Sequence, residues 1–293
     1  MYELISVGPR TWYMDCPTRV GVYEHSPGRV CCIDSGSDGG AAKRLLRHLE
    51  ERGWTLTAIF NTHSHADHVG GNSLLQARTG VPAYAWGVEA PFVRDPVLEP
   101  MVLFGAHPYR EIRNKFLEAK PSDCRALTED VLPPGLTFAD LHGHAAGMVG
   151  YRTDDDVWFV ADAVLSEEAL EKYHVSYLYD VGAYLETLDR LETMEGRLFI
   201  PSHAEPTADL HPLIAANRRQ TRAVLDLLLE LLAEPMTAEQ VIRAVFCRYE
   251  MKMVHNQYAT VGATLRSCLS YLRGEKLLDV FFDDNYQWWR RSA

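Results

Sequence analysis

The chain has 293 residues, 47% of them hydrophobic and 24% charged, a composition typical of a globular protein with one substantial core. It contains no apolar run near the roughly 18 to 20 residues that cross a bilayer, and its first residues lack the pattern of a secretory signal. We therefore expect a cytoplasmic protein that does not bind membranes. Forty acidic against 29 basic residues give a net charge of −11, which argues against tight, non-specific nucleic-acid binding.

The first third of the chain alternates between strand-like and helical segments. VGVYEH and RVCCID are short β-rich runs with a turn at Gly28, and residues 39–52 carry apolar positions at helical spacing up to Gly53. LTAIFN is then a buried strand that ends at Thr62, and a helix is expected from Asp67 through residues 69–77. This alternation predicts a layered α/β architecture.

Residues 87–130 are expected to form an irregular connection, because they contain five prolines and no clear periodicity. A long connection inside a compact domain is often a lid or a binding loop. An ordinary surface insertion fits the same sequence equally well.

The last part of the chain changes character near residue 208. Strand signals return in GLTFADLH, MVGYRT, VWFVAD and RLFIPS, but three helical segments follow, and LLDVFFDD and YQWW close the chain as a hairpin. We predict a catalytic domain over residues 1–207 and a mainly helical module over residues 208–293, which loosely resembles a winged helix. The acidity of the chain disfavours DNA binding by this module and favours a homodimer contact or a cover over the substrate.

The strongest chemical signal is THSHADHVGG, which follows a predicted strand and contains His63, His65, Asp67 and His68. Neutral imidazole is a good ligand for zinc or iron. In an extended segment His63 and His65 point to the same side, and a turn at Ala66 can bring the next two ligands to an adjacent metal. Chance would produce this pattern in about one chain in a thousand or fewer, so the sequence predicts a metal site.

The pattern H-x-H-x-D-H followed by Gly-Gly resembles the signature of the metallo-β-lactamase superfamily, and the similarity covers roughly residues 1–207. This resemblance implies an α/β fold, namely a four-layer αβ/βα sandwich with its metal site at one edge of two packed sheets. The mainly helical module would follow this sandwich. The superfamily uses three further metal ligands.

Each of these ligands has a candidate in the chain. His144, in LHGHAAGMVGY, matches the histidine of a G-H-x-x-G turn, and we prefer it to His142 on that match. Asp162, in VWFVADAV, matches a carboxylate that bridges two metals, although alanine precedes it where glycine is usual. His203, in IPSHAEP, matches a late histidine, and here serine replaces the usual glycine.

The resemblance thus implies two divalent metal ions, of which zinc is the first expectation, while iron or manganese suit the same ligands. It assigns one metal to His63, His65 and His144, the other to Asp67, His68 and His203, and places Asp162 between them. Asp34, in CIDSG, matches an aspartate that supports such sites through hydrogen bonds.

These assignments predict a hydrolase in which a hydroxide bridging the two metals attacks a small ester, thioester, lactone or amide. Asp67 would orient the nucleophile and relay its proton. Tyr173 and Tyr177, which follow the bridging aspartate, are weaker candidates for substrate contacts, because packing tyrosines are commoner.

Several alternatives stay open within the superfamily. Glyoxalase II enzymes resemble the chain in their helical C-terminal extension, yet the Cys-Gly-Lys/Arg-Phe segment that they carry after the bridging aspartate is absent. Secreted metallo-β-lactamases and lactonases of quorum signals are further options. A phosphodiesterase or ribonuclease is the alternative from a different class, and the net charge of −11 argues against it. A non-catalytic binding protein is least favoured, because the ligand set is complete.

Overall fold

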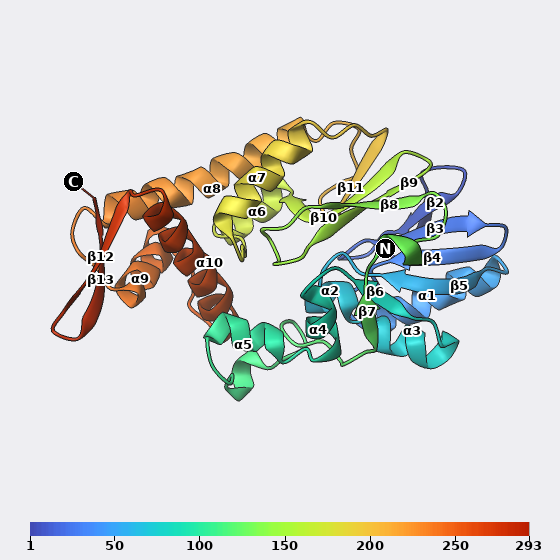
Figure 1. Cartoon of the computed structure of the whole chain (residues 1–293), viewed down its shortest axis with the longest axis horizontal. Coiled ribbons are helices and arrows are strands. Elements are labelled where there is room, and N and C mark those ends of the chain that lie inside the picture. Colours follow the sequence, from blue (N-terminus) through green and yellow to red (C-terminus); the bar gives the residue numbers. More distant parts are fainter. Residues whose placement is uncertain (293) are drawn as a thin grey trace.

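The computed structural model describes residues 1–292, which form two mixed sheets with helices on their outer faces (Figure 1). A cluster of buried side chains from both sheets lies between them. The four-layer αβ/βα arrangement expected from the sequence is thereby confirmed. Within the described residues no helix is long and apolar enough to cross a membrane.

The first sheet has seven strands whose spatial order is their order in the chain. They are β1 (Leu4–Ser6), β2 (Thr11–Met14), β3 (Val20–Ser26), β4 (Arg29–Ile33), β5 (Thr55–Phe60), β6 (Ala83–Ala85) and β7 (Cys124–Ala126). The pairs from β1 to β4 are antiparallel, and those from β4 to β7 are parallel. The amphipathic helix α1 (Gly39–Glu51) buries Leu45 and Leu49 in a core that this sheet shares.

The second sheet has four strands in the order β11-β10-β9-β8. They are β8 (Leu136–Asp140), β9 (Val149–Thr153), β10 (Val157–Leu165) and β11 (Leu198–His203). β10 and β11 pair in parallel, whereas β9 pairs with both of its neighbours in antiparallel fashion. The helices after β10 are α6 (Glu167–Tyr173) and α7 (Val181–Glu192), and α7 packs against β10.

Large aromatic residues fill the space between the two sheets and fix their relative position. Tyr23 and Phe60 from the first sheet are buried against Tyr151 from the second. Fully burying one such side chain contributes about 1.5 to 3 kcal/mol. The Tyr151 hydroxyl also donates a hydrogen bond of 3.0 Å to the Asn61 carbonyl, and the Val149 amide donates one of 3.0 Å to the Thr62 carbonyl. These contacts hold the loop after β5 against β9.

The helix expected from Asp67 through residues 69–77 is two helices, α2 (Ala66–Val69) and α3 (Asn72–Thr79). Gly70 and Gly71 separate them. A Cβ atom on Gly70 would lie 2.3 Å from the Ser37 carbonyl oxygen, and one on Gly71 would lie 2.4 Å from the Ser35 carbonyl oxygen. The prediction of one continuous helix was wrong because the backbone passes this close to the loop after β4, which only glycine allows.

The segment 87–130 is more regular than the sequence predicts. It contains α4 (Glu89–Arg94), α5 (Leu98–Phe104), the 3-10 turns η1 (Arg110–Ile112) and η2 (Glu129–Val131), and strand β7. Pro91 and Pro100 lie in the first turns of α4 and α5, where a helix needs no amide hydrogen from them. The expectation of an irregular connection was therefore wrong in part, since these prolines lie in the first turns of helices.

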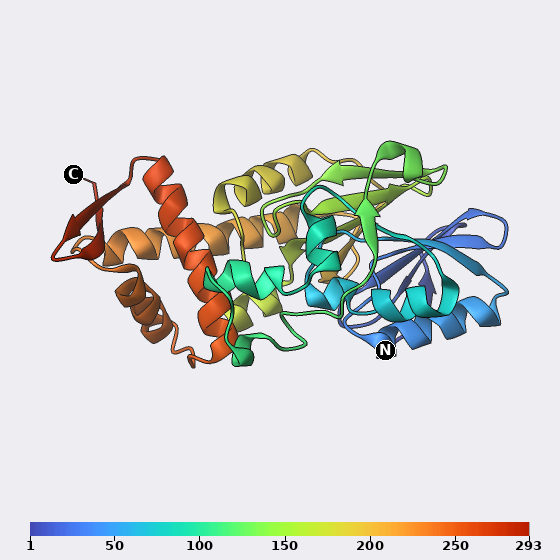
Figure 2. The ribbon, with the colours of Figure 1, turned by 60° about the horizontal axis from the view of Figure 1, so that its bottom comes forward.

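The C-terminal part consists of α8 (His211–Leu231), α9 (Ala238–Arg248), α10 (His255–Gly274), β12 (Leu278–Asp283) and β13 (Tyr286–Arg291). The predicted hairpin is confirmed, with Asp284 and Asn285 at positive φ between paired strands. One buried cluster contains Val164 from β10, Leu188 from α7 and Leu265 from α10. The C-terminal helices therefore share a core with the second sheet, and α10 also lies beside α5 (Figure 2). A domain boundary near residue 208 stays a prediction.

Candidate metal centre

The seven candidate ligands come from separate parts of the chain and meet where the two sheets adjoin. They are His63 and His65 after β5, Asp67 and His68 on α2, His144 between β8 and β9, Asp162 in β10 and His203 at the end of β11. Their possible ligand atoms form three overlapping groups, and within each group these atoms lie within 4.8 Å of one another. The predicted constellation is thus brought together in full.

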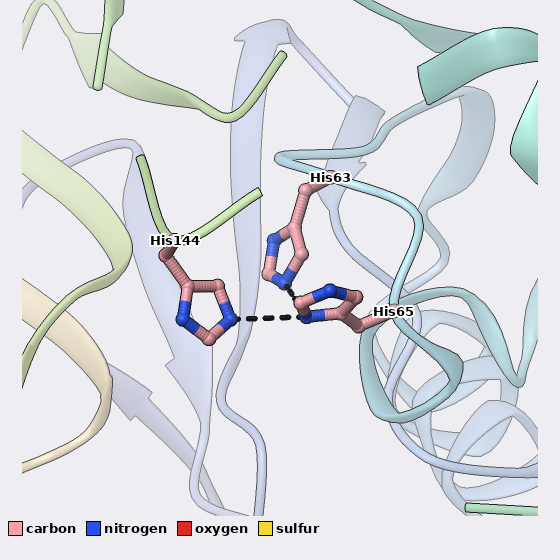
Figure 3. A group of neighbouring side chains, drawn as sticks. All are labelled: His63, His65 and His144. Carbon is pink, nitrogen blue, oxygen red and sulfur yellow. Dashed lines mark hydrogen bonds between the residues drawn. The ribbon is translucent and has the colours of Figure 1, made fainter. Parts of the chain in front are cut away.

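His63, His65 and His144 make up the first of these groups, called here the three-histidine group (Figure 3). His65 Nδ1 lies 2.9 Å from His63 Nε2 and 3.0 Å from His144 Nε2. The three ring nitrogens therefore converge on one point from three directions. This is how three imidazoles are arranged around a single metal ion.

Asp67, His68 and His203 make up a second group, called here the mixed group. The Nε2 atom of His203 lies 3.2 Å from Asp67 Oδ2, and the Nε2 atom of His68 lies 3.8 Å from the same oxygen. The group combines two imidazoles with one carboxylate.

Asp162 lies between the two groups. Its Oδ2 atom is 3.4 Å from His144 Nε2 of the three-histidine group and 3.4 Å from His203 Nε2 of the mixed group. Its Oδ1 atom is 3.2 Å from His68 Nε2. One carboxylate thus faces ligand atoms of both groups.

Four of the five histidines direct their second ring nitrogen at an oxygen atom outside the ligand set. The pairs are His63 Nδ1 with Thr62 Oγ1 at 3.0 Å, His68 Nδ1 with Asp34 Oδ2 at 2.8 Å, His144 Nδ1 with the Tyr177 carbonyl at 3.0 Å and His203 Nδ1 with the Pro17 carbonyl at 3.1 Å. A hydrogen on each of these nitrogens leaves the other nitrogen with a lone pair that faces the site. Metal-binding histidines are oriented in this way.

His68 Nε2 and Asp162 Oδ1 lie 3.2 Å apart without the geometry of a hydrogen bond, so these two buried atoms have no hydrogen-bond partner among the described residues. Buried polar atoms are nearly always satisfied, so each such exception needs a ligand or another explanation. Imidazole and carboxylate are donors that suit zinc, iron and manganese. The residues present therefore fit divalent metal ions.

The imidazole pKa values are shifted in opposite directions in the two groups. Burial lowers the imidazole pKa values of the three-histidine group, to about 4 for His65 and about 3 for His144. Burial also acts on the mixed group, but neighbouring carboxylates outweigh it there. Asp162 and Asp67 raise the pKa of His203 to about 10. They also raise the pKa of His68 well above its usual value.

This difference predicts that metal binding to the metal-free protein depends on pH at one group only. Below its pKa of about 10, His203 must release a proton before it can bind a metal, so the affinity of the mixed group should rise with pH. The histidines of the three-histidine group are neutral above pH values of about 5, so their affinity should stay level. Binding isotherms measured between about pH 6 and pH 8 should resolve two binding events, one with an affinity that rises with pH and one with an affinity that does not change. Two events whose affinities are both independent of pH, or a pH-dependent affinity at the three-histidine group, would refute this expectation.

Asp34, which the sequence predicts to support the site, is buried and contacts His68 of the mixed group. Its Oδ1 atom accepts a hydrogen bond of 2.8 Å from the Thr62 amide, and its Oδ2 atom accepts from the Thr62 hydroxyl and pairs with His68 Nδ1. Its φ of +61° lies in the left-handed region, which aspartate and asparagine tolerate better than most side chains.

Asp34→Asn is expected to weaken metal binding at the mixed group by about 10- to 100-fold. The asparagine amide keeps the backbone conformation but points an N–H group at another donor, either His68 Nδ1–H or the Thr62 amide. Chelator competition at each group would measure the loss. Asp38→Asn is the matched control, because Asp38 caps α1 and asparagine caps helices equally well. Equal affinities in both variants would show that Asp34 does not support the site.

His142, Tyr173 and Tyr177 are the remaining candidates from the sequence. His142 pairs with Asp140 at 2.7 Å and belongs to none of the ligand groups, which include His144 instead. Tyr177 lies with its ring against His65, and both Tyr173 and Tyr177 line the cleft beside the site.

Ala161 and Ser202 stand at two positions where the family usually has glycine, and only one of them has a backbone conformation that favours glycine. Ala161 precedes Asp162 at a bulge in β10, with a φ of +50°. Glycine would adopt this left-handed conformation without strain, which explains the family preference at that position. Ser202 has no positive φ, so its backbone does not require glycine.

Several supporting residues have no signal in the sequence. The loop between β2 and β3 contacts the mixed group. The Thr18 hydroxyl donates a hydrogen bond of 2.8 Å to Asp67 Oδ2, and the Arg19 guanidinium donates one to the Ala204 carbonyl beside His203. The segment 87–130 contributes Glu89 and Glu99, which lie against the histidine loops. Burial, followed by the neighbouring carboxylate of Glu89, raises the pKa of Glu99 to about 8. None of these residues lies in a sequence motif that predicts which residue it contacts.

Comparisons with known proteins agree with this geometry. The family model described as "Metallo-beta-lactamase superfamily" matches residues 14–203. A metallo-beta-lactamase family protein from Thermus thermophilus has a similar structure over 98% of this chain and 100% of its own, with a TM-score of 0.71 and 21% identity. At that identity the likeness concerns the fold alone.

Two curated relatives are similar in sequence over part of the chain. The "Probable metallo-hydrolase YqgX" of Bacillus subtilis (strain 168) is 27% identical over 180 residues, which are 59% of this chain and 79% of the relative. A hydroxyacylglutathione hydrolase of Nitrobacter winogradskyi is 31% identical over 152 residues, which are 50% of this chain and 48% of that enzyme. In the hydroxyacylglutathione hydrolase of Maricaulis maris the matched part is only 23% of the enzyme's length.

The fold and the clustered histidines and aspartates define a metal-binding hydrolase. The chain belongs to the metallo-β-lactamase superfamily, whose model matches well over half of it, including every candidate ligand.

Proposed function

We propose that this metallo-hydrolase binds two divalent metal ions, zinc first among them, and cleaves a small ester, thioester, lactone or amide. The position of Asp162 carries the proposal. Its Oδ2 atom lies 3.4 Å from an imidazole nitrogen of each group, which suits a carboxylate shared by two ions. A site for a single metal would not need a carboxylate in this place.

A cleft next to the site supports a small-molecule substrate. It has a volume of about 710 Å³ and reaches from Asp67, His144, Asp162 and His203 to the C-terminal helix α10. Binding sites for small molecules range from about 300 to 1,000 Å³. Because α10 forms one wall of the cleft, the C-terminal part would cover the substrate, as one of the sequence-based alternatives proposes.

When bound, divalent ions supply a nucleophile from water at neutral pH and polarise the oxygen of the substrate. The chain itself orients the ligands and moves the proton. Asp67 Oδ2 accepts from the Thr18 hydroxyl and faces His203 Nε2, which fixes the carboxylate at the edge of the cleft. Asp67 can then take up the proton of the attacking water and pass it to the leaving group.

Two of the relatives are named hydroxyacylglutathione hydrolases, and an acyl group in the named substrate favours an acyl substrate for this chain. The net charge of −11 disfavours a polyanionic substrate such as RNA. We therefore place carboxylic-acid derivatives ahead of phosphodiesters.

The test is a substrate panel of thioesters, lactones, β-lactams, phosphodiesters and RNA, with metal-stripped protein as the control. We expect turnover of one class of acyl substrate, lost on stripping and restored by added zinc, iron or manganese. Turnover of phosphodiesters or RNA alone would overturn the acyl assignment and leave a metallo-phosphodiesterase. Turnover that survives complete stripping would overturn the metal-dependent reaction itself.

A further inference from the structure

Two glutamates of the segment 87–130, one buried and one mostly buried, lie against the histidine loops, and nothing in the sequence motifs assigns them a role. Glu89 is 3% exposed and lies in the first turn of α4. The side chain of Glu99 is 12% exposed and lies in the first turn of α5. Burying a carboxylate is costly unless charge or hydrogen bonds compensate, so each of them needs an explanation.

Glu89 connects the two loops that provide the three-histidine group. Its Oε2 atom accepts hydrogen bonds from the amide and the hydroxyl of Ser64, at 2.9 and 2.5 Å. Its Oε1 atom accepts one from the Gly147 amide at 2.8 Å. Ser64 stands between His63 and His65, and Gly147 is three residues after His144. One side chain therefore fixes the spacing of the loops that carry all three imidazoles.

Glu99 contacts the group from another side. Its Oε1 atom lies 3.4 Å from His65 Nε2, the ring nitrogen that faces away from the other two histidines. Among the five histidines of the site, His65 is the one whose second ring nitrogen has no hydrogen-bonded oxygen within the described residues. A carboxylate in this place favours a hydrogen on Nε2 and leaves the lone pair on Nδ1, toward the site.

The charges around these glutamates also favour a metal ion at the three-histidine group. Within the described residues neither glutamate forms an ion pair with lysine or arginine, and His65 is the one basic side chain within ion-pair distance of Glu99. A divalent cation bound by the three histidines would supply a positive charge next to Glu99 and would favour its carboxylate form over the protonated acid.

We propose that Glu89 and Glu99 are positioning residues for the three-histidine group, which makes the segment 87–130 an integral part of the metal centre. The inference rests on metal binding in the proposed function, but it does not depend on the substrate. It is an alternative to both roles expected for this segment from the sequence, namely a lid or binding loop and an ordinary surface insertion.

The test isolates each group by removing a ligand of the other. In a His203→Ala background, cobalt(II) binding at the three-histidine group can be followed by visible absorption and by chelator competition. Glu89→Gln and Glu99→Gln are each expected to weaken this binding by about 10- to 100-fold and to shift the cobalt absorption band. In a His144→Ala background, both substitutions should leave cobalt binding at the mixed group unchanged.

Two controls separate positioning from a general loss of structure. Glu171→Gln changes an exposed glutamate of α6 and should have no effect in either background. Glu89→Gln replaces a buried hydrogen-bond acceptor and can lower the unfolding temperature of the metal-free protein. Glu99→Gln makes no such change to backbone hydrogen bonds, so its selective effect at the three-histidine group should occur at an unchanged unfolding temperature.

Three outcomes would overturn the inference. These are unchanged cobalt affinity and spectrum in Glu99→Gln, equal losses at both groups, and losses explained wholly by unfolding. Absence of cobalt binding in the parent protein would instead contradict the proposed function, so the two failures are distinguishable.

Discussion

Asp67→Ala is expected to lower kcat by a factor of about 10² to 10⁴ while the fold stays intact. Asp67 is both a member of the mixed group and the residue we propose for proton transfer at the edge of the cleft. Its side chain is 39% exposed and its burial contributes little to the core, so the loss should be chemical and not structural. Steady-state kinetics on the substrate found by the panel would measure it.

Asp226→Ala is the matched control for this variant. Asp226 is an exposed aspartate of α8, and its replacement should leave both turnover and the unfolding temperature at their original values. A rate near that of the unmodified protein in Asp67→Ala would contradict the assignment of Asp67. A loss accompanied by unfolding in circular dichroism would point to a structural role.

Asp162→Asn is expected to reduce the bound metal from about two ions to about one per chain and kcat/KM by at least about 100-fold. Such a loss corresponds to about 2.7 kcal/mol of transition-state stabilisation. The reason is that the Asp162 carboxylate faces imidazole nitrogens of both groups, at 3.4 Å from each. An amide cannot offer two anionic oxygens to two cations.

Elemental analysis after dialysis against metal-free buffer would measure this change, with Asp226→Asn as the control. Two ions per chain in Asp162→Asn would show that the carboxylate is not shared between them. A full loss of both ions without unfolding would still support the position of Asp162, but it would make that residue essential to both sites.

The sequence predicts the fold class, and it identifies the candidate ligands that the structure brings together, because both depend on local patterns. H-x-H-x-D-H places four ligands within six residues after a strand, and strand-to-helix alternation follows from hydrophobic periodicity. His144 and His203 carry weaker motifs, but their order along the chain identifies them. The structure brings all of these residues to one place.

The sequence cannot predict contacts that depend on how distant segments meet. Glu89 reaches Ser64 and Gly147 only because α4 packs under both loops, and no spacing rule connects these three positions. Pro91 and Pro100 suggest an irregular segment, although each lies in the first turn of a helix. The break at Gly70 likewise depends on a close backbone contact with the distant loop after β4.

The most direct test of the account is the metal content of the purified protein, reconstituted with zinc and freed of loosely bound ions. The account predicts about two ions per chain, held by separate events that His144→Ala and His203→Ala each remove one at a time. Only one ion at saturation, or two ions whose binding neither substitution affects, would contradict a binuclear centre built from these residues.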